Sequence, residues 1–533
     1  MNSRPDPFAP PAPRPPRSIV MWTMALIYLL VGVIGHDPWR GDDANYFGPV
    51  LDMLHGRHWL IPHIAGEPFL DYPPLYYWVA ALTTRLTEWA LPLYDGARLA
   101  SALLVGLTLW LCADASRRMH GDNARAAAFL LMLGTLGLVV HAHETQPLLA
   151  VMAAQAVTFW GVAYSARRRL AGAVACGLGI GLAFLANGVN AVLITAPALF
   201  FLAGAGPMLL GLLTALATAG AWIGLAAHSE PALLALWWKT HLLAFTPALD
   251  NIADPAALFG LLGWFTWPLW PIAGWALWRE RRHLALAHWR MLIACSLLTL
   301  ISTIFFIELR PANALPLLVP LALMAAAGLT TLRRGAANAF DWFSGMSFAV
   351  FAILLWTGWT SLTLSWPPGL GRHVDKVTPN FVVGDPLWPS VAGIVLCALW
   401  IGLLANSRRS PYRGAKNWAA GMTMLWCLAV VLLQPWFDYG KSYRAAAQSL
   451  AQVLQETPAG CIERIDVSAS LRVSLDYFAG ITTTAYTPHG PRCDAVLVFG
   501  VARPKSLDDT WQARWTYARG GGRKREEIRL YMR

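Results

Sequence analysis

The chain has 533 residues and a formal net charge of +11, with 56% hydrophobic and only 13% charged residues. Soluble domains carry about 25% charged residues, so this composition excludes a protein that is entirely water-soluble. The positive charge collects in short loops between apolar stretches. That pattern is a signal of membrane topology, and it leaves little reason to expect nucleic-acid binding.

The N-terminal segment, residues 1–17, is rich in proline and is predicted to be disordered and cytoplasmic. The apolar run that follows has no small-residue cleavage site, so it is interpreted as an uncleaved anchor. Windows of about 19 residues predict an all-α membrane domain over 18–436 with thirteen spans. The spans lie at 18–35, 97–116, 123–141, 146–166, 171–187, 189–205, 207–227, 256–278, 290–307, 312–331, 340–363, 386–405 and 417–436.

Arginine and lysine residues occupy alternate loops, and the positive-inside rule therefore places those loops in the cytoplasm. With an odd number of spans, the C-terminus lies on the opposite, outer face. The polar segments with chemically useful side chains fall on that same face. They are 36–96, 141–145, 228–255, 308–313 and 364–385.

The last segment, residues 437–533, changes character and is predicted to be a small α/β domain outside the membrane. It has a helical pattern at 441–457 and strand-like runs at 481–486, 495–500 and 526–532. Cys461 and Cys493 are the only cysteines in this tail, and an oxidising compartment would let them form a disulfide. Two unpaired thiols are the alternative.

The segment 40–79 is too polar for lipid and is enclosed by hydrophobic spans. It contains the carboxylates Asp42, Asp43 and Asp71, and a helix is expected over 44–55. Two prolines follow Asp71 and admit only an extended chain, which would aim its side chain before a helix that begins near residue 75. These features predict a site at the membrane surface.

Asp42-Asp43-Ala-Asn-Tyr46 is followed by WLIP at 59–62, by Gly66 and by DYPPLYYW at 71–78. This series resembles D-E-x-R-Y, W-x-x-P, Gly and E-K-P-P-L-x-Y-W in the first outer loop of bacterial GT-C glycosyltransferases. The resemblance is to the lipid A aminoarabinose transferases and their relatives, the protein O-mannosyltransferases. Further similar motifs are GLAFLANG at 181–188, the segment 238–245, and Leu315-Pro316 followed by Pro320.

The resemblance implies a GT-C fold of about 13 transmembrane helices in a bacterial inner membrane, with the C-terminal α/β domain in the periplasm. It also implies an inverting, monomeric enzyme that moves a sugar from a polyprenyl-phosphate donor to a lipid, glycan or protein acceptor. Asp42 matches the first acidic residue of the group and is the expected general base. Asp43 would perturb the charge of Asp42 or bind the acceptor. The alternative is that both are solvated loop carboxylates or helix caps.

Tyr46, Glu144 and Tyr76 are expected on the acceptor side of the site, with turn capping and an interfacial aromatic belt as alternatives. Asp71 and His241 match an acidic residue and a histidine of the group, and they could share a divalent metal cation. A hydrogen-bonded interfacial residue is the alternative for His241. Four further histidines of the outer face are predicted to be interfacial polar residues: His58, His63, His141 and His143.

The sequence departs from the group's pattern at four cationic positions, which here hold Asn45, Tyr72, Asn187 and Ala244. Tyr72 still falls where the donor phosphate is expected. Compensation is expected from Arg40, Lys239 or Arg310, and an arginine suits a phosphate best. The alternative for Arg310 is an ion pair with Glu308.

A transporter or flippase of lipid-linked substrates is the alternative class of function. Transporters place charges at the centre of the membrane and often contain repeated halves. Here no convincing internal repeat is visible, and the charges gather on one face. A polar path through the membrane centre would favour transport, whereas a single outward site would favour the enzyme.

Overall fold

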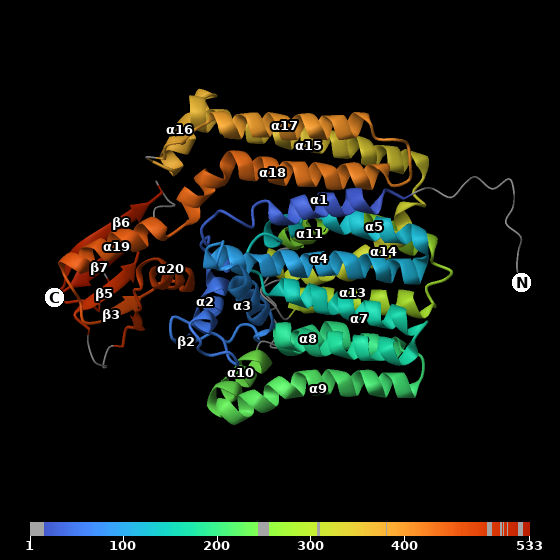
Figure 1. Cartoon of the computed structure of the whole chain (residues 1–533), viewed down its shortest axis with the longest axis horizontal. Coiled ribbons are helices and arrows are strands. Elements are labelled where there is room, and N and C mark those ends of the chain that lie inside the picture. The colour runs from blue at the N-terminus through green and yellow to red at the C-terminus, as the bar shows by residue number, and fades with distance from the viewer. Residues whose placement is uncertain are drawn as a thin grey trace, which may run out of the picture.

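The computed structural model of the chain describes residues 15–243, 255–305, 310–379, 381–487, 493–500, 504, 506–508, 510–520 and 526–533. A bundle of long helices is joined at one end by a small α/β unit (Figure 1). The helical elements of the bundle are α1 (Ser18–Leu30), α4 (Leu93–His120), α5 (Asp122–Leu133), α6 (Leu138–His141), α7 (Leu148–Ser165), α8 (Arg169–Thr195), η1 (Ala196–Phe201), α9 (Ala205–Ser229), α10 (Pro231–Leu243), α11 (Pro255–Phe265), α12 (Leu269–Arg279), α13 (Ala287–Phe305), η3 (Pro311–Leu317), α14 (Leu318–Leu329), α15 (Arg334–Leu364), α16 (Pro368–Val377), α17 (Leu387–Ala405) and α18 (Arg413–Lys441).

Nine helices among the described residues are long and apolar enough to cross a membrane: α4, α7, α8 with η1, α9, α13, η3 with α14, α15, α17 and α18. The chain is therefore a mostly helical, multi-pass membrane protein. The expected spans at 18–35, 123–141 and 256–278 contain shorter helices, since α1 has 13 residues, α5 has 12 and the third is divided into α11 and α12. Helices this short extend about 16–20 Å, less than a hydrocarbon layer of about 30 Å. The count of thirteen spans stays a prediction.

Helix α8 contains a reversal at Asn187 and Gly188, where φ is −152° and 58°. A Cβ atom on Gly177 would lie 2.1 Å from the backbone oxygen of Gly211, and one on Gly181 would lie 2.5 Å from Thr218. The first part of α8 therefore runs in the same direction as α9, and the chain between them must return. This return agrees with the separate spans expected at 171–187 and 189–205, and the positive φ explains a glycine at 188.

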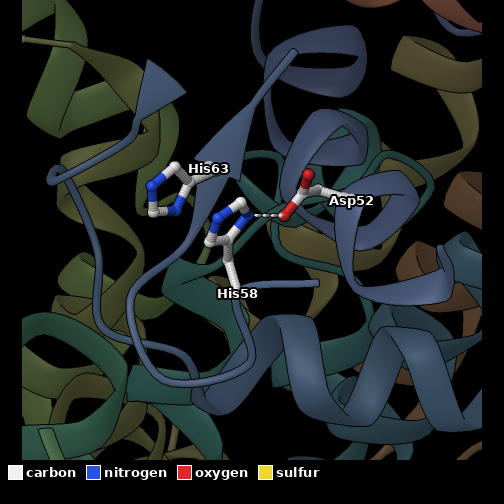
Figure 2. Close-up of side chains that lie close together, drawn as sticks. All are labelled: Asp52, His58 and His63. Atoms are coloured by element: carbon white, nitrogen blue, oxygen red, sulfur yellow. Dashed lines mark hydrogen bonds and ion pairs between the residues drawn. The ribbon is translucent and has the colours of Figure 1, made fainter. Parts of the chain in front are cut away.

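The polar segment between α1 and α4 folds into α2 (Asp42–Leu54), β1 (His63–Ile64), β2 (Glu67–Pro68) and α3 (Leu75–Thr87). Strands β1 and β2 form an antiparallel pair. The helices expected over 44–55 and from residue 75 are confirmed. The loop after α2 also brings His58 and His63 next to Asp52, which the sequence did not predict (Figure 2).

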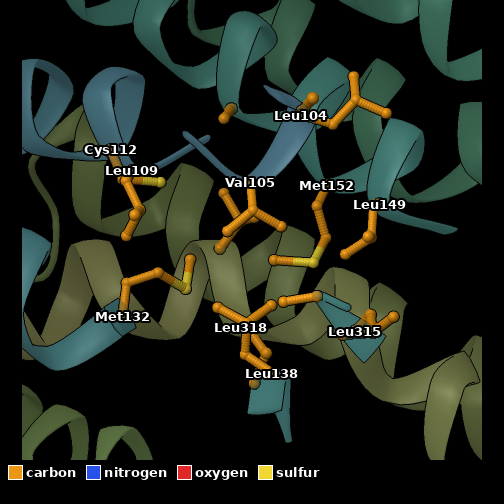
Figure 3. Close-up of a cluster of buried hydrophobic side chains, with 14 of the residues drawn as sticks. Leu104, Val105, Leu109, Cys112, Met132, Leu138, Leu149, Met152, Leu315 and Leu318 are labelled. Atoms are coloured by element: carbon orange, nitrogen blue, oxygen red, sulfur yellow. The ribbon is translucent and has the colours of Figure 1, made fainter. Parts of the chain in front are cut away.

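Helix α4 lies at the centre of the bundle and contacts α5, α7 and α14. Figure 3 shows a buried apolar cluster that these helices share with α6 and η3: Leu104, Val105, Leu109, Cys112, Met132, Leu138, Leu149, Met152, Leu315 and Leu318. Close approach of α7 and α8 depends on glycine, because a Cβ atom on Gly161 would lie 2.4 Å from the backbone nitrogen of Cys176. Small residues at such contacts let membrane helices pack tightly where lipid gives no hydrophobic driving force.

The C-terminal unit has a five-stranded mixed sheet with the strand order β4-β3-β5-β7-β6. Its elements are α19 (Arg444–Glu456), β3 (Ile462–Ile465), α20 (Ala469–Ala479), β4 (Thr484–Ala485), β5 (Ala495–Phe499), β6 (Gln512–Arg519) and β7 (Glu526–Met532). The predicted α/β fold and the Cys461–Cys493 disulfide, with a Cα–Cα distance of 5.1 Å, are confirmed. Strands β3 and β6 and helix α20 were not predicted.

This unit docks on the polar segment through packing and ion pairs. Gly48 of α2 faces Val473 of α20, and a Cβ atom at Gly48 would lie 2.6 Å from the Val473 side chain. Arg464 donates to both carboxylate oxygens of Glu67 at 2.6 Å, and Arg40 pairs with Glu526. The α/β unit is therefore fixed beside the first turn of α2.

Candidate active site

Asp42 and Asp43 are the first two residues of α2 and lie in its first turn. The side chain of Asp42 is half-buried, and Gln146 Nε2 donates to its Oδ2 at 3.3 Å. Burial raises the pKa of Asp42, and the nearby charge of Glu144 raises it further. A carboxylate with a raised pKa accepts a proton more readily than an ordinary aspartate.

Asp71 and Arg310 lie on the same side of this helix end. The charge of Arg310 acts on both Asp42 and Asp71, so the three groups are within electrostatic range of one another. Asp71 keeps contact with solvent, while the groups packed round it raise its pKa by burial. Two carboxylates and a guanidinium therefore gather here from α2, the segment before α3 and the segment before η3.

Tyr46 and Tyr72 form the wall next to Asp42. Their rings meet edge to face with centroids 5.4 Å apart, and their hydroxyls are hydrogen-bonded. Burial raises the pKa of both phenols, so both stay neutral. Tyr72 therefore supplies a hydrogen-bonding hydroxyl near the carboxylates, where the resembling proteins carry a lysine.

Glu144 reaches the site from the turn after α6. Its Oε1 atom forms an ion pair with His141 and lies 3.5 Å from Gln146 Nε2. The charge of Glu144 also acts on Asp42. Glu144 was expected on the acceptor side, and the structure places it near Asp42, while its contact with an acceptor stays a prediction. His141 is part of the same cluster and is more than an interfacial residue.

Tyr76 was expected to line the acceptor side, and the structure places it elsewhere. Its side chain is 0% exposed, and its hydroxyl bonds to Ser101 Oγ at 2.7 Å. Ser101 Oγ in turn donates to the backbone oxygen of Glu144 at 2.6 Å. Tyr76 supports the turn that carries Glu144, and the expected acceptor contact is wrong because no part of the side chain reaches solvent.

Asp43 was expected to act with Asp42, but the structure gives it another role. It is 2% exposed, and Arg98 binds both oxygens, with Nη2–Oδ2 at 2.7 Å and Nε–Oδ1 at 3.1 Å. The backbone nitrogens of Trp39 and Thr145 donate to the same carboxylate at 3.0 and 2.9 Å. Asp43 is thus a buried structural anion with no lone pair left for an acceptor.

Arg98 and Thr145 are the important residues that the sequence interpretation missed. Arg98 also binds Asp95 Oδ1 at 3.0 Å and is itself 0% exposed. Thr145 adds a hydroxyl bond to Asp43 Oδ1 at 2.9 Å. A signal for Arg98 existed, because an aspartate and an arginine three residues apart at the start of an apolar span demand partners.

The three cations proposed for the donor phosphate, Arg40, Lys239 and Arg310, lie in different environments. Arg310 faces the two carboxylates, whereas Arg40 is an ion-pair partner of Glu526 in the C-terminal unit. Lys239 lies exposed on α10. Glu308 and Ala244 lie outside the described residues. Arg310 is therefore the candidate that the geometry favours for the donor phosphate.

His241 lies next to Asp71. Its ring is hydrogen-bonded to the backbone of Asp71, and its Nδ1 is 3.1 Å from the backbone oxygen of Trp237. The reversal of α8 packs on the same histidine, since a Cβ atom on Gly188 would lie 3.0 Å from it. The structure thus brings His241 to the backbone of Asp71, while a metal ion shared with the Asp71 carboxylate stays a prediction.

Comparisons with known proteins agree with this architecture. Residues 71–234 match the family described as dolichyl-phosphate-mannose-protein mannosyltransferase. An undecaprenyl phosphate-alpha-4-amino-4-deoxy-L-arabinose arabinosyl transferase of Pseudomonas aeruginosa strain UCBPP-PA14 is 27% identical over 448 residues, covering 77% of this chain and 75% of the relative. The corresponding enzyme of strain PAO1 is also 27% identical, covering 78% of this chain and 75% of the relative.

The crystal structure of ArnT from Cupriavidus metallidurans bound to undecaprenyl phosphate superposes with a TM-score of 0.65 at 14% identity, covering 96% of this chain and 97% of that chain. The present chain therefore has the fold of ArnT, and its sequence is similar to those of the arabinosyl transferases. The matched family region contains Asp71, Tyr72 and Glu144 but excludes Asp42 and Arg310. For those two residues, the geometry of the present chain carries the argument.

Proposed function

We propose that this chain is a membrane glycosyltransferase that takes a sugar from a polyprenyl-phosphate donor. The observation that carries the proposal is the half-buried Asp42, held by Gln146 and facing Asp71 and Arg310 at the end of the bundle where the α/β unit docks. The named activity of the Pseudomonas aeruginosa relatives and the lipid phosphate in the ArnT structure support the donor class. The sequence similarity extends over most of the chain.

In the proposed reaction, Asp42 accepts the proton of an acceptor hydroxyl as its oxygen attacks the anomeric carbon of the sugar. The new bond joins that oxygen to the anomeric carbon, and the bond from this carbon to the phosphate oxygen breaks. The polyprenyl phosphate leaves with the electron pair, and Arg310 stabilises the negative charge. A single displacement of this kind inverts the anomeric configuration.

The remaining residues of the site act on these two groups. Glu144 keeps the pKa of Asp42 raised, and Asp43 with Arg98 fixes the helix end that carries Asp42. If a divalent cation is bound, Asp71 and His241 would hold it, because a carboxylate and an imidazole are suitable ligands and the His241 ring already contacts the backbone of Asp71. Such an ion would neutralise phosphate charge.

We also propose the bacterial inner membrane, thirteen passes, a cytoplasmic N-terminus and a periplasmic C-terminal unit for this protein. The basic loops support this orientation, and the disulfide supports an oxidising compartment for the C-terminal unit. The acceptor, whether lipid A, a glycan or a protein, would then reach the site from the periplasm. The enzyme is proposed to act as a monomer.

Transport is less well supported by the described residues. In α4 the charged side chains occupy the two ends of the helix, with Asp95 and Arg98 at one end and Asp114, Arg117 and Arg118 at the other. The middle of this central helix carries no charged residue. A charged path along it is therefore absent.

The test uses the purified full-length protein in lipid nanodiscs, with polyprenyl-phosphate sugars as donors and lipid A as the first acceptor. Mass spectrometry would follow both the release of polyprenyl phosphate and the glycosylated product. Asp42→Asn should lower turnover by about 100-fold or more, and the exposed surface variant Glu88→Gln should match the wild type. Movement of intact donor between leaflets without cleavage of the sugar–phosphate bond would refute the transferase and favour the flippase. Mass spectrometry of the envelope of a deletion strain would identify the natural acceptor.

A further inference from the structure

Asp52, His58 and His63 form a second cluster of polar side chains at the other end of α2 from Asp42. Their potential ligand atoms all lie within 4.8 Å of one another. Figure 2 shows the two imidazole rings side by side, with the carboxylate of Asp52 bonded to His58. Ten residues of helix separate Asp42 from Asp52, which is about 15 Å along the axis. The cluster is therefore distinct from the proposed active site.

The bonds within the cluster orient both rings. His58 Nδ1 is 2.8 Å from Asp52 Oδ2, and His63 Nδ1 is 2.8 Å from the backbone oxygen of Ile61. The rings are stacked with centroids 3.7 Å apart. His63 can donate from Nδ1 to this carbonyl oxygen and present Nε2 as a lone pair, which is the usual arrangement of a metal-binding histidine. In His58 the nitrogen next to Asp52 is itself the candidate ligand, so a bound ion would replace the hydrogen bond between these two side chains.

A buried carboxylate oxygen that accepts no hydrogen bond is the second observation. Asp52 is 3% exposed, and its Oδ1 accepts no hydrogen bond from the described residues. This oxygen forms an ion pair with the exposed Arg57, whose Nε is 3.4 Å away. Leaving a buried oxygen without a hydrogen bond costs free energy, and a metal ion in direct contact would satisfy it.

The backbone conformation of His58 and the charges around the cluster also support a bound cation. His58 has a φ of 43°, a left-handed conformation that a residue with a side chain seldom adopts, and such conformations persist where function requires a particular placement. Two further carboxylates approach from other elements: Glu230 at the end of α9 acts on His63, and Asp476 of α20 interacts with Asp52. Arg57 acts on Asp52 and Asp476 as a cation. Three carboxylates therefore act against one arginine here, and this balance favours a bound metal ion.

We propose that Asp52, His58 and His63 bind one divalent transition-metal ion, with Zn²⁺ the preferred occupant. Two imidazoles and a carboxylate are a ligand set that suits Zn²⁺, with water or a nearby carboxylate completing the shell. The ion holds the loop after α2 against the last turn of that helix. Helix α2 in turn packs on α20 of the C-terminal unit. Its role is structural, and it lies outside the transfer reaction.

The experiment uses the purified full-length protein in detergent, stripped with a chelator, dialysed and then supplied with Zn²⁺ alone. Metal content by mass spectrometry and the thermal unfolding temperature are measured with and without the ion. The wild type should bind one more equivalent of Zn²⁺ than Asp52→Asn, His58→Gln or His63→Gln. Zinc should raise the unfolding temperature of the wild type and leave that of the variants unchanged.

Two controls make the result specific. His55→Gln removes an exposed histidine of the same turn that lies outside the cluster, and it should bind Zn²⁺ as the wild type does. His241→Gln would remove any ion held next to Asp71, so loss of zinc only in that variant would overturn the proposal. Equal zinc content in the wild type and in the three cluster variants would also overturn it.

A measurement on the wild type alone covers the case in which a variant fails to fold. Co²⁺ replaces Zn²⁺ and gives intense visible absorption bands in a four-coordinate site with nitrogen ligands. Those bands are expected in the wild-type protein and in His241→Gln. A wild-type protein that binds neither ion after chelator treatment would refute the site.

Discussion

Replacing Arg98 by methionine should be among the most destabilising single changes in the protein. The guanidinium has five N–H donors, and all five are used: Nε on Asp43, Nη1 on Asp95 and the backbone oxygen of His36, and Nη2 on Asp43 and the backbone oxygen of Asp37. The side chain is 0% exposed, and Asp43 and Asp95 are 2% and 1% exposed. Removal of the cation therefore leaves two buried carboxylates with hydrogen bonds from neighbouring groups but without the positive charge that compensates them.

Breaking a buried ion pair in this way costs about 3–5 kcal/mol. The assay is equilibrium unfolding of the purified protein in detergent, followed by tryptophan fluorescence. Arg85→Met is the matched control, because Arg85 pairs with Glu88 at 3.2 Å while the two side chains are 51% and 38% exposed, and exposed pairs contribute about 0–1 kcal/mol. The double variant Arg98→Met with Asp43→Asn should recover part of the loss, since it removes both charges. If Arg98→Met costs no more than Arg85→Met, the argument from burial is wrong.

The same pair gives a pH dependence with a definite sign. Burial acts to raise the pKa of Asp43, but the charge and hydrogen bonds of Arg98, with those of His36 and Thr145, lower it to about 2. A carboxyl group with a lowered folded-state pKa stabilises the protein fully above its ordinary value of 3.8, and this stabilisation is lost as the pH falls towards 2. The difference between wild type and Arg98→Met should therefore narrow between about pH 4 and pH 2.

Four further predictions concern the site and the C-terminal unit. Asp42→Asn should keep the fold and donor binding but lower turnover by about 100-fold or more, measured as polyprenyl phosphate release; near-normal turnover would exclude Asp42 as the base. Because burial and the charge of Glu144 raise the pKa of Asp42, Glu144→Gln should move the acid limb of the kcat/KM profile to lower pH, and an unmoved limb would contradict the coupling. Arg310→Ala should weaken donor use by about 1.5–3 kcal/mol, and an unchanged donor KM would show that another group binds the phosphate. Serine at Cys461 and Cys493 should destabilise the C-terminal unit by about 3–4 kcal/mol, and equal protease sensitivity with and without the disulfide would contradict this value.

The sequence predicted those features that depend on local patterns. The apolar windows located the long helices, and the strands at 484–485, 495–499 and 526–532 follow from alternation and β-branched residues. The Cys461–Cys493 disulfide followed from the topology, since only these two cysteines lie in the tail. The polar residues of the first outer loop likewise identified Asp42 and Asp71 before any contact was known.

The pairings between distant residues could not be predicted. Asp43 and Arg98 are separated by 55 positions, and nothing in the local pattern distinguishes Asp43 from its neighbour Asp42. The geometry of the helix separates their roles. Consecutive residues point in directions about 100° apart on an α-helix, so the Asp43 carboxylate enters the protein and the Asp42 carboxylate faces the site. The ion pair of Arg40 with Glu526 and the cluster of Asp52 with two histidines depend on tertiary docking in the same way.

The loss of the cations expected from related sequences has a consistent physical result. Tyr72 stands where a lysine was expected, and its neutral hydroxyl bonds to Tyr46 beside Asp42. Burial and the charge of Glu144 both raise the pKa of Asp42. A lysine at position 72 would oppose this rise with its positive charge, and the neutral Tyr72 does not, so the pKa of Asp42 stays above its ordinary value. The same replacement leaves Arg310 as the described cation whose charge reaches both Asp42 and Asp71. We therefore expect Tyr72 to strengthen Asp42 as a base and to make the donor phosphate more dependent on Arg310.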